Sequence, residues 1–198
     1  MTYAIILDGV PMQLRGGFTD NSGTKHPANV LSQWSPPELA AINVHPITEG
    51  TIPDGHTVTG SALEWNGETV TRAYTTEAIP LADLKAVKLA ALKTRRGQAE
   101  EGGITVGGID IPTDERTQGR VDQICKALDD GDITGPIDFS VDDGWQTLNE
   151  ATLRAIKAAG AQHIQACFSR QRALSSDIAA AADLTALNSI NINSGWPQ

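Results

Sequence analysis

The sequence predicts an α+β fold, in which a small hairpin-rich N-terminal unit precedes a mainly helical module with two short β-hairpins. Three observations predict it. Alternating apolar residues flank the turn signals Asp8-Gly9 and Asn66-Gly67 in the first part of the chain. Further along, apolar residues recur at helical spacing. Short alternating segments around Gly107-Gly108 and Asp143-Gly144 lie between these helical stretches.

The first hairpin has a specific turn. Asp-Gly is a preferred type I′ pair, because both central residues of that turn need a positive φ. Pro11 cannot donate a ladder hydrogen bond, so its strand should lie at a sheet edge or carry a bulge. With the turn at Asp8-Gly9, one face carries the pairs Leu7 with Val10, Ile5 with Met12 and Tyr3 with Leu14.

The rest of this N-terminal unit, 1–76, is predicted to hold one short helix and a second hairpin. Ser35-Pro36-Pro37-Glu38 begins the helix, because a Ser at the N-cap and a Glu three residues later form a capping box. The helix ends near Ile42, and 46–56 is expected to be a loop. In the second hairpin, a turn at Asn66-Gly67 puts Leu63 opposite Val70, with Trp65 on the same face.

The helical module is expected over 77–198. Its predicted elements are helix 80–99, hairpin 104–111, helix 114–129, hairpin 137–147, and helices 149–172 and 176–183. The buried side of helix 114–129 is marked by Val121, Ile124, Cys125 and Leu128. Gly160 lies inside the long helix, where a glycine costs about 1 kcal/mol relative to alanine. We therefore expect Gly160 to pack closely against a neighbour.

The helix 80–99 carries the candidate interaction residues. Its narrow apolar stripe consists of Leu81, Leu84, Val87 and Ala91. Two interpretations stay open: an amphipathic helix lying on its own domain, or a self-association helix. Two heptads are too few to identify a coiled coil from sequence. Arg95 and Arg96 follow, and they either dock an acidic partner or form a solvated helix end.

Metal and cofactor sites are not expected. His163 and Cys167 lie four residues apart on one helix, which is half of a zinc site, whereas zinc takes three or four protein ligands. The acidic stretches Asp129–Asp132 and Asp142-Asp143 lack the ligand spacing of a calcium loop. They are predicted to be turns, with a weak surface cation as the alternative.

Composition excludes several classes of function. A formal net charge of -9, with an acidic excess in both halves, argues against binding of nucleic acid or of an anionic membrane. No apolar run approaches the length of a membrane helix, so no membrane insertion is expected. Two cysteines do not make a disulfide scaffold. Neither a phosphate-binding loop nor a nucleophile elbow is present, and we predict a protein that is not an enzyme.

From about Leu81 to its C-terminus the chain resembles an uncharacterised domain family common in tail-fibre and baseplate gene clusters of tailed bacteriophages and prophages. The segments that carry the resemblance are Lys93-Thr94-Arg95-Arg96, Gly102-Gly103-Ile104, Gly107-Gly108-Ile109, Thr113-Asp114, Asp143-Gly144-Trp145, the stretch 161–168 and Gly195-Trp196-Pro197. A weaker likeness to N-terminal modules of phage tail proteins rests on 34–42 and on Trp65-Asn66-Gly67.

The resemblance implies a structural protein of the virion tail, made in the bacterial host cytoplasm: a tail fibre, a fibre adaptor or a baseplate-peripheral protein. It implies other tail or baseplate proteins as partners, and assembly as a homotrimer or a symmetric ring. Two alternatives are a fibre-assembly chaperone that is absent from the mature particle, and a receptor-binding tip. In the latter, Trp145 or Trp196 would contact the host surface, although core packing would also use each of them.

Overall fold

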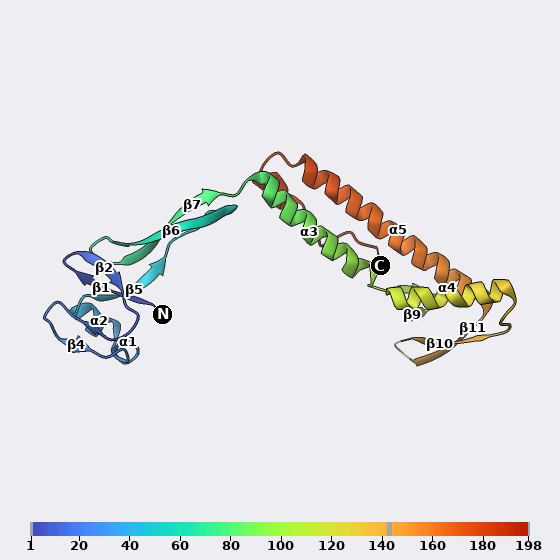
Figure 1. The fold of residues 1–198 in the computed structure, drawn as a ribbon, viewed down its shortest axis with the longest axis horizontal. Coiled ribbons are helices and arrows are strands. Elements are labelled where there is room, and N and C mark those ends of the chain that lie inside the picture. The colour runs from blue at the N-terminus through green and yellow to red at the C-terminus, as the bar shows by residue number, and fades with distance from the viewer. Residues whose placement is uncertain (1, 142–143, 198) are drawn as a thin grey trace. The chain divides into compact units, whose positions relative to one another are not determined.

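The computed structural model describes residues 2–141 and 144–197, and the chain divides into two compact units after Ile79 (Figure 1). Unit 1 precedes this point and unit 2 begins at Pro80. The boundary expected from the sequence, between 76 and 77, falls inside the last strand of unit 1, which continues to Ala78. Mixed helices and short hairpins confirm the predicted α+β class.

Unit 1 is built on a five-stranded sheet of order β2-β1-β5-β7-β6, in which β5 and β7 are parallel and the other neighbours antiparallel. Its strands are β1 (Tyr3–Leu7), β2 (Val10–Gln13), β5 (Val44–Glu49), β6 (His56–Trp65) and β7 (Val70–Ala78). The expectation of a loop over 46–56 is therefore wrong for its first residues. Strand β5 pairs with β1 and β7, which are distant in sequence, and it buries Val44 and Ile47.

The hairpin of β1 and β2 confirms the predicted turn and register. Asp8 and Gly9 have φ values of 50° and 82°, as a type I′ turn requires, and Leu7 pairs with Val10. The prediction for Pro11 is also confirmed, since β2 is an edge strand. Strand β1 buries residues on both faces, so it separates two small cores. One contains Ala4, Ile6, Ile47 and Val70, and the other Ile5, Val30, Leu39 and Val44.

Four short elements complete unit 1: β3 (Phe18–Thr19), β4 (Lys25–His26), α1 (Val30–Gln33) and α2 (Pro36–Ala41). The predicted capping residues begin α2, where the Ser35 N–H donates to the Glu38 carboxylate at 2.7 Å. Leu39 then packs with Ile5 of β1, which fixes the helix on one face of the sheet.

The register of the second hairpin differs from the prediction. Trp65 pairs with Val70, and Leu63 with Arg72, so four residues separate the strands where two were expected. The side chain of Asn66 explains the longer turn, because its Oδ1 accepts hydrogen bonds from the N–H groups of Glu68 and Thr69 at 2.9 and 2.8 Å. A shift of two residues keeps Leu63 and Trp65 on the predicted face.

Unit 2 alternates helices with two-stranded hairpins. Its elements are α3 (Leu81–Glu100), β8 (Ile104–Val106), β9 (Ile109–Ile111), α4 (Glu115–Asp130), β10 (Ile137–Val141), β11 (Gly144–Leu148), α5 (Glu150–Ala180) and α6 (Leu184–Ser189). The predicted hairpin at Gly107-Gly108 is confirmed, with Val106 paired with Ile109. The segment 131–136 between α4 and β10 is exposed throughout. Among the described residues, no helix combines the length and the apolar character needed to cross a membrane.

Unit 2 contains two hydrophobic clusters, one on each half of α5. The hairpin core lies around the first half of α5 and contains Ile111, Val121, Cys125, Phe139, Leu148, Leu153 and Ile156. The helix core lies around the second half and contains Leu92, Leu174, Ile178, Ala181 and Leu187. Helices α3 and α5 lie side by side in Figure 1, in agreement with their contacts. The predicted buried side of α4 is confirmed by its place in the hairpin core.

The two helices predicted over 149–172 and 176–183 are wrong, because α5 is one helix that continues to Ala180. Ser175 and Ser176 were expected to cap a new helix, but they lie inside α5. Leu174 and Ile178 on either side of them are 3% and 0% exposed in the helix core. Burial of these two side chains outweighs the weak capping preference of serine. The next helix, α6, begins later, where Asp183 caps it through the Ala186 N–H at 2.8 Å.

Candidate functional site

The four residues proposed for self-association do not share one face of α3. Leu81 and Leu84 pack on the helix core of their own unit, whereas Val87 is 69% exposed and Ala91 is also exposed. Leu92, which is 0% exposed, lies on the same packed side of α3 as Leu81 and Leu84. The partly buried side chain of Lys88 also lies on this side. Lys88 Nζ donates to the carbonyl oxygen of Leu187 in α6. Self-association through α3 stays a prediction, with Val87 and Ala91 as the residues left at the surface.

Arg95 and Arg96, proposed for docking, make contacts within unit 2. The Arg95 guanidinium lies 5.6 Å from the ring centroid of Trp196, and that of Arg96 lies 4.5 Å from the centroid of Phe168. Arg96 also donates to the Glu100 carboxylate at 2.6 Å. Cation–π contacts of this kind hold a guanidinium over an aromatic face. The arginines therefore fasten the C-terminal segment and α5 to α3, and docking to an acidic partner stays a prediction.

Trp145 is the most exposed large apolar side chain described in unit 2, at 78%. Its strand, β11, alternates: Leu148 faces the hairpin core, so Trp145 and Thr147 face outward. Of the two uses left open for Trp145, core packing does not hold, because the side chain is exposed. Trp196 is partly buried, and its Nε1–H donates to the carbonyl oxygen of Ile192 at 2.9 Å. The predicted acidic turn at Asp142-Asp143 lies outside the described residues.

A cavity of about 260 Å³, here called the Gly160 cavity, opens between α4, α5 and the β8–β9 hairpin. Its apolar wall consists of Ile104, Ile111, Pro112, Val121 and Ile156. Polar side chains lie on the α4 side and across the rim: Thr117, Gln118, Asp122 and Lys157. Lys157 of α5 and Asp122 of α4 form an ion pair at 3.0 Å, which raises the pKa of the lysine.

Gly160 itself explains the empty space. It is buried on the packed side of α5, in series with Leu153, Ile156 and His163. A Cβ placed at Gly160 would have no atom within 4 Å. The expected close packing against a neighbour is therefore wrong. The other buried positions of α5 carry side chains, whereas Gly160 leaves this space empty. The spacing of apolar residues in the sequence does not reveal such a space.

His163 and Cys167 are both buried, and they lie beside α3. His163 Nε2 lies 2.9 Å from the Ala99 carbonyl oxygen, which fixes a proton on that nitrogen, and 3.8 Å from Cys167 Sγ. Burial raises the pKa of the Cys167 thiol. Across 2–141 and 144–197, no group of three or more His, Cys, Asp or Glu side chains is arranged to hold a metal ion. The histidine here hydrogen-bonds two helices together.

The two acidic residues that end α4, Asp129 and Asp130, form ion pairs. Arg154 of α5 donates to Asp129 at 2.5 Å and to Glu150 at 2.8 Å. Its hydrogen bond and positive charge lower the pKa of the Asp129 carboxyl. Lys126 forms an ion pair with Asp130 on the same helix. These carboxylates are thus neutralised by side chains of the chain itself, whereas the sequence left a cation as the alternative.

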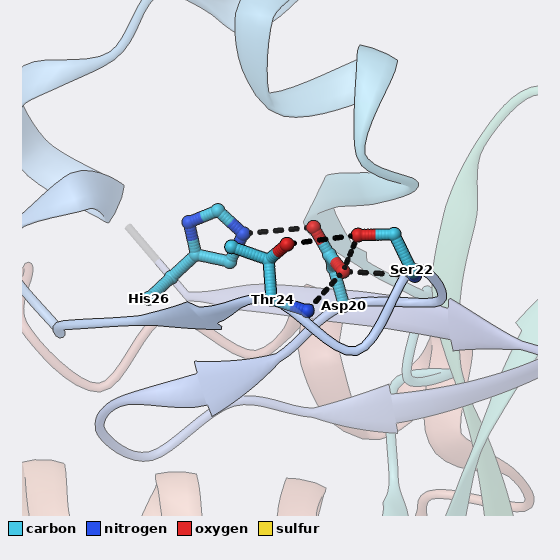
Figure 2. Close-up of polar contacts among 4 residues, drawn as sticks. All are labelled: Asp20, Ser22, Thr24 and His26. Carbon is cyan, nitrogen blue, oxygen red and sulfur yellow. Dashed lines mark hydrogen bonds and ion pairs between the residues drawn. The ribbon is translucent and has the colours of Figure 1, made fainter.

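In unit 1, a polar cluster ties the turn between β3 and β4 (Figure 2). Asp20 Oδ1 accepts from the Ser22 hydroxyl at 2.6 Å and from the Thr24 N–H at 3.0 Å, while Oδ2 lies 2.9 Å from His26 Nε2. These bonds, led by that of Ser22, lower the pKa of Asp20. The serine donates to the carboxylate and not to the histidine, so the cluster lacks the nucleophile–base pair of a hydrolase. It holds a loop in shape.

Comparison with known proteins places unit 2 in a family. Residues 83–191 match the family described as Domain of unknown function (DUF4376). No curated protein and no solved structure matches the chain. The matched segment extends from the first turn of α3 to just beyond α6, and it includes Trp145 and the Gly160 cavity. Because the match covers more than half of the 198 residues, the chain belongs to the DUF4376 family.

Proposed function

We propose that this protein is a non-enzymatic structural component of a bacteriophage tail tip: a tail fibre, a fibre adaptor or a baseplate-peripheral protein. The observation that carries the proposal is a contrast in unit 2 between polar side chains that have partners within the chain and large apolar side chains that are exposed. His163 is hydrogen-bonded to backbone and Asp129 is paired with Arg154, whereas Val87 and Trp145 are 69% and 78% exposed. Tryptophan is enriched among the residues that dominate binding energy at protein interfaces.

In this proposal each unit has its own partner. Unit 1 docks on a neighbouring tail or baseplate protein, and unit 2 binds further copies of itself to form a homotrimer or a symmetric ring. The resemblance to tail-gene modules supports the location in the virion, after synthesis in the host cytoplasm. Unit 1 presents Val10 and Met12 on its edge strand β2, 59% and 53% exposed, as apolar residues for docking.

Quantitative mass spectrometry of purified phage particles tests the location. A structural component is expected at a constant ratio to the major tail protein, from a few to dozens of copies per particle. A fibre-assembly chaperone, the alternative, is absent from particles and co-purifies with a fibre protein from infected cells. Absence from particles therefore contradicts the structural role. A known capsid protein and a known host cytoplasmic protein serve as controls for purification.

Exposure of Trp145 also favours a second candidate, a receptor-binding tip. An exposed indole is a flat apolar surface suited to stacking on a sugar ring of a host glycan. Particles that carry Trp145→Ala are then expected to assemble normally and to adsorb more slowly to host cells. Normal adsorption by intact variant particles contradicts receptor binding at this residue.

A further inference from the structure

We propose that Trp145 of one copy inserts into the Gly160 cavity of a second copy. The inference rests on the self-association in the proposed function and names the residues that make it. Both features lie in unit 2 and belong to different elements, a hairpin strand and a helix junction. One chain therefore carries both a projecting side chain and a cavity that can accept it.

The cavity has the size and chemistry for an indole. A cavity of about 150 Å³ lined by aliphatic and aromatic side chains is enough to bind benzene, and the Gly160 cavity measures about 260 Å³. Val121, Ile156 and Ile111 supply apolar contacts to the ring. An indole N–H needs an acceptor when it is buried, and Gln118 and Asp122, which both carry acceptor oxygens, are among the lining residues.

The glycine that keeps this space open has no other role in the packing. Its helical position would accept alanine, because no atom lies within 4 Å of an added Cβ and its φ is not positive. A glycine in a helix interior costs about 1 kcal/mol relative to alanine. Unlike Gly119 of α4, which has the same space for a Cβ, Gly160 lines the cavity, so the side chain it lacks would enter that space.

Trp145 is a suitable occupant because it is exposed on a hairpin that is anchored in the hairpin core. The base of its hairpin is anchored in the hairpin core by Phe139 and Leu148, 6% and 2% exposed. Next to the tryptophan, Thr147 Oγ1 donates to Asp138 at 3.0 Å across the strands. A tryptophan buries about 150–250 Å² when it is enclosed, and it is among the residues that dominate binding energy at interfaces.

A second copy is the occupant that the molecule itself supplies. Insertion of one copy's tryptophan into the next copy's cavity is a heterologous contact, which closes into a ring or continues as an open chain. This geometry agrees with the symmetric ring of the proposed function. It also separates the contact from association through Val87 and Ala91 of α3.

Two variants that remove opposite sides of the contact test the proposal in the full chain. Trp145→Ala removes the inserted side chain and Gly160→Leu fills the cavity. Sedimentation velocity over a concentration series is expected to show self-association by the natural chain. Each variant should weaken it about 30-fold, equivalent to about 2 kcal/mol. Gly119→Leu, a helical glycine away from the cavity with equal space for a Cβ, is the matched control and should associate normally.

An equimolar mixture of the two variants gives the decisive result. Trp145 of the Gly160→Leu chain can enter the intact cavity of the Trp145→Ala chain, and no further growth is possible. The mixture is therefore expected to form one-to-one dimers at concentrations where each variant alone, weakened about 30-fold, is largely monomeric. Gly160→Met, whose unbranched side chain adapts to irregular space, replaces Gly160→Leu if the latter lowers the melting temperature.

The outcomes that overturn the inference are distinct from those that overturn the proposed function. A natural chain that is monomeric up to about 100 μM, where an affinity of biological use would be visible, contradicts the contact. So does Trp145→Ala that associates as the natural chain does. If Val87→Asp dissociates the oligomer and Trp145→Ala does not, association uses α3. The structural role in the particle then stands, because mass spectrometry of particles tests it separately.

Discussion

The first half of α5 packs on two hairpins and α4, whereas the second half packs on α3 and α6. In the hairpin core, Gly160 leaves a cavity of about 260 Å³ and the neighbouring hairpin exposes Trp145. In the helix core, Leu92 and Ile178 are both 0% exposed, and lysines of α3 donate to backbone carbonyls of the helices they cover. The second half of the helix is closely packed, and the first half borders a cavity and a hairpin with an exposed tryptophan.

Leu92→Ala should show the largest effect, because it removes a fully buried side chain from the helix core. Such a substitution costs about 3–5 kcal/mol of the free energy of unfolding when the surroundings cannot collapse. Urea denaturation followed by circular dichroism measures it. Leu89→Ala on the same helix, where the side chain is 38% exposed, is the control and should cost less than about 1 kcal/mol. Equal losses for the two variants would contradict the close packing of the helix core around the second half of α5.

Ser176→Pro tests whether α5 is continuous through its second half. Ser176 is an exposed residue inside the helix, so proline there removes a backbone hydrogen bond and costs about 3 kcal/mol. If a new helix began at this point, proline would be tolerated in its first turn. Thermal denaturation compares the variant with Ser176→Ala. Equal melting temperatures for the two would sink the single-helix description.

Asp114→Ala probes the hairpin core through the N-cap of α4. The Thr117 N–H donates to Asp114 at 3.0 Å, and loss of such a cap costs about 1 kcal/mol at pH 7. The hydrogen bonds from Thr117 lower the pKa of Asp114, so its contribution is complete above the unfolded pKa of about 3.9 and is lost as pH falls further. Denaturant titrations at several pH values measure this. A difference from the natural chain that is unchanged at pH 2 would refute it, and exposed Asp132→Ala is the control.

Gly160→Ala should have the smallest effect and the opposite sign. Alanine gains about 0.5–1 kcal/mol in a helix interior, and the added methyl group enters empty space. A rise in melting temperature is expected in differential scanning calorimetry. Gly131→Ala, at the positive φ of 79° that ends α4, should lower the melting temperature. A loss of stability in Gly160→Ala would show that the first half of α5 is as tightly packed as the second.

Local chemistry made part of the fold predictable from the sequence. The turn at Asp8-Gly9 requires positive φ at both residues, and only a few residue types supply it, so strand register followed. The turn at Gly107-Gly108 allowed the register of its hairpin to be predicted for the same reason. The short helix at Pro36 was fixed by the capping residues around it. In each case the determining contacts lie within a few residues of one another.

Contacts between distant segments account for the features that the sequence did not reveal. Strand β5 exists because β1 and β7 pair with it from both sides. Ser175 and Ser176 read as a helix start, but packing of Leu174 and Ile178 on α3 continues the helix. Arg95 and Arg96 have aromatic partners about 70 to 100 residues away, which no local pattern indicates.

The candidate site also depends on contacts between distant segments. The exception is the exposure of Trp145. Exposure of Trp145 was available from the sequence, because strict alternation with the buried Leu148 sends it outward. The weight given to tryptophan as a core residue hid this signal. Gly160 was identified as unusual, but whether a helical glycine marks a close approach or an empty space depends on the facing elements. The tertiary structure was needed to decide between these two possibilities.

The exposed segment 131–136 gives the molecule a place where foreign sequence fits. The elements on either side are both held by the hairpin core, α4 through Val121 and Cys125 and β10 through Phe139. Lengthening a loop is inexpensive, since each doubling costs only about 0.6 kcal/mol of closure entropy. A short epitope or dye-binding peptide inserted here leaves the cores intact. If the protein belongs to the phage tail as proposed, its copies then become countable by antibody labelling or by fluorescence from a single particle.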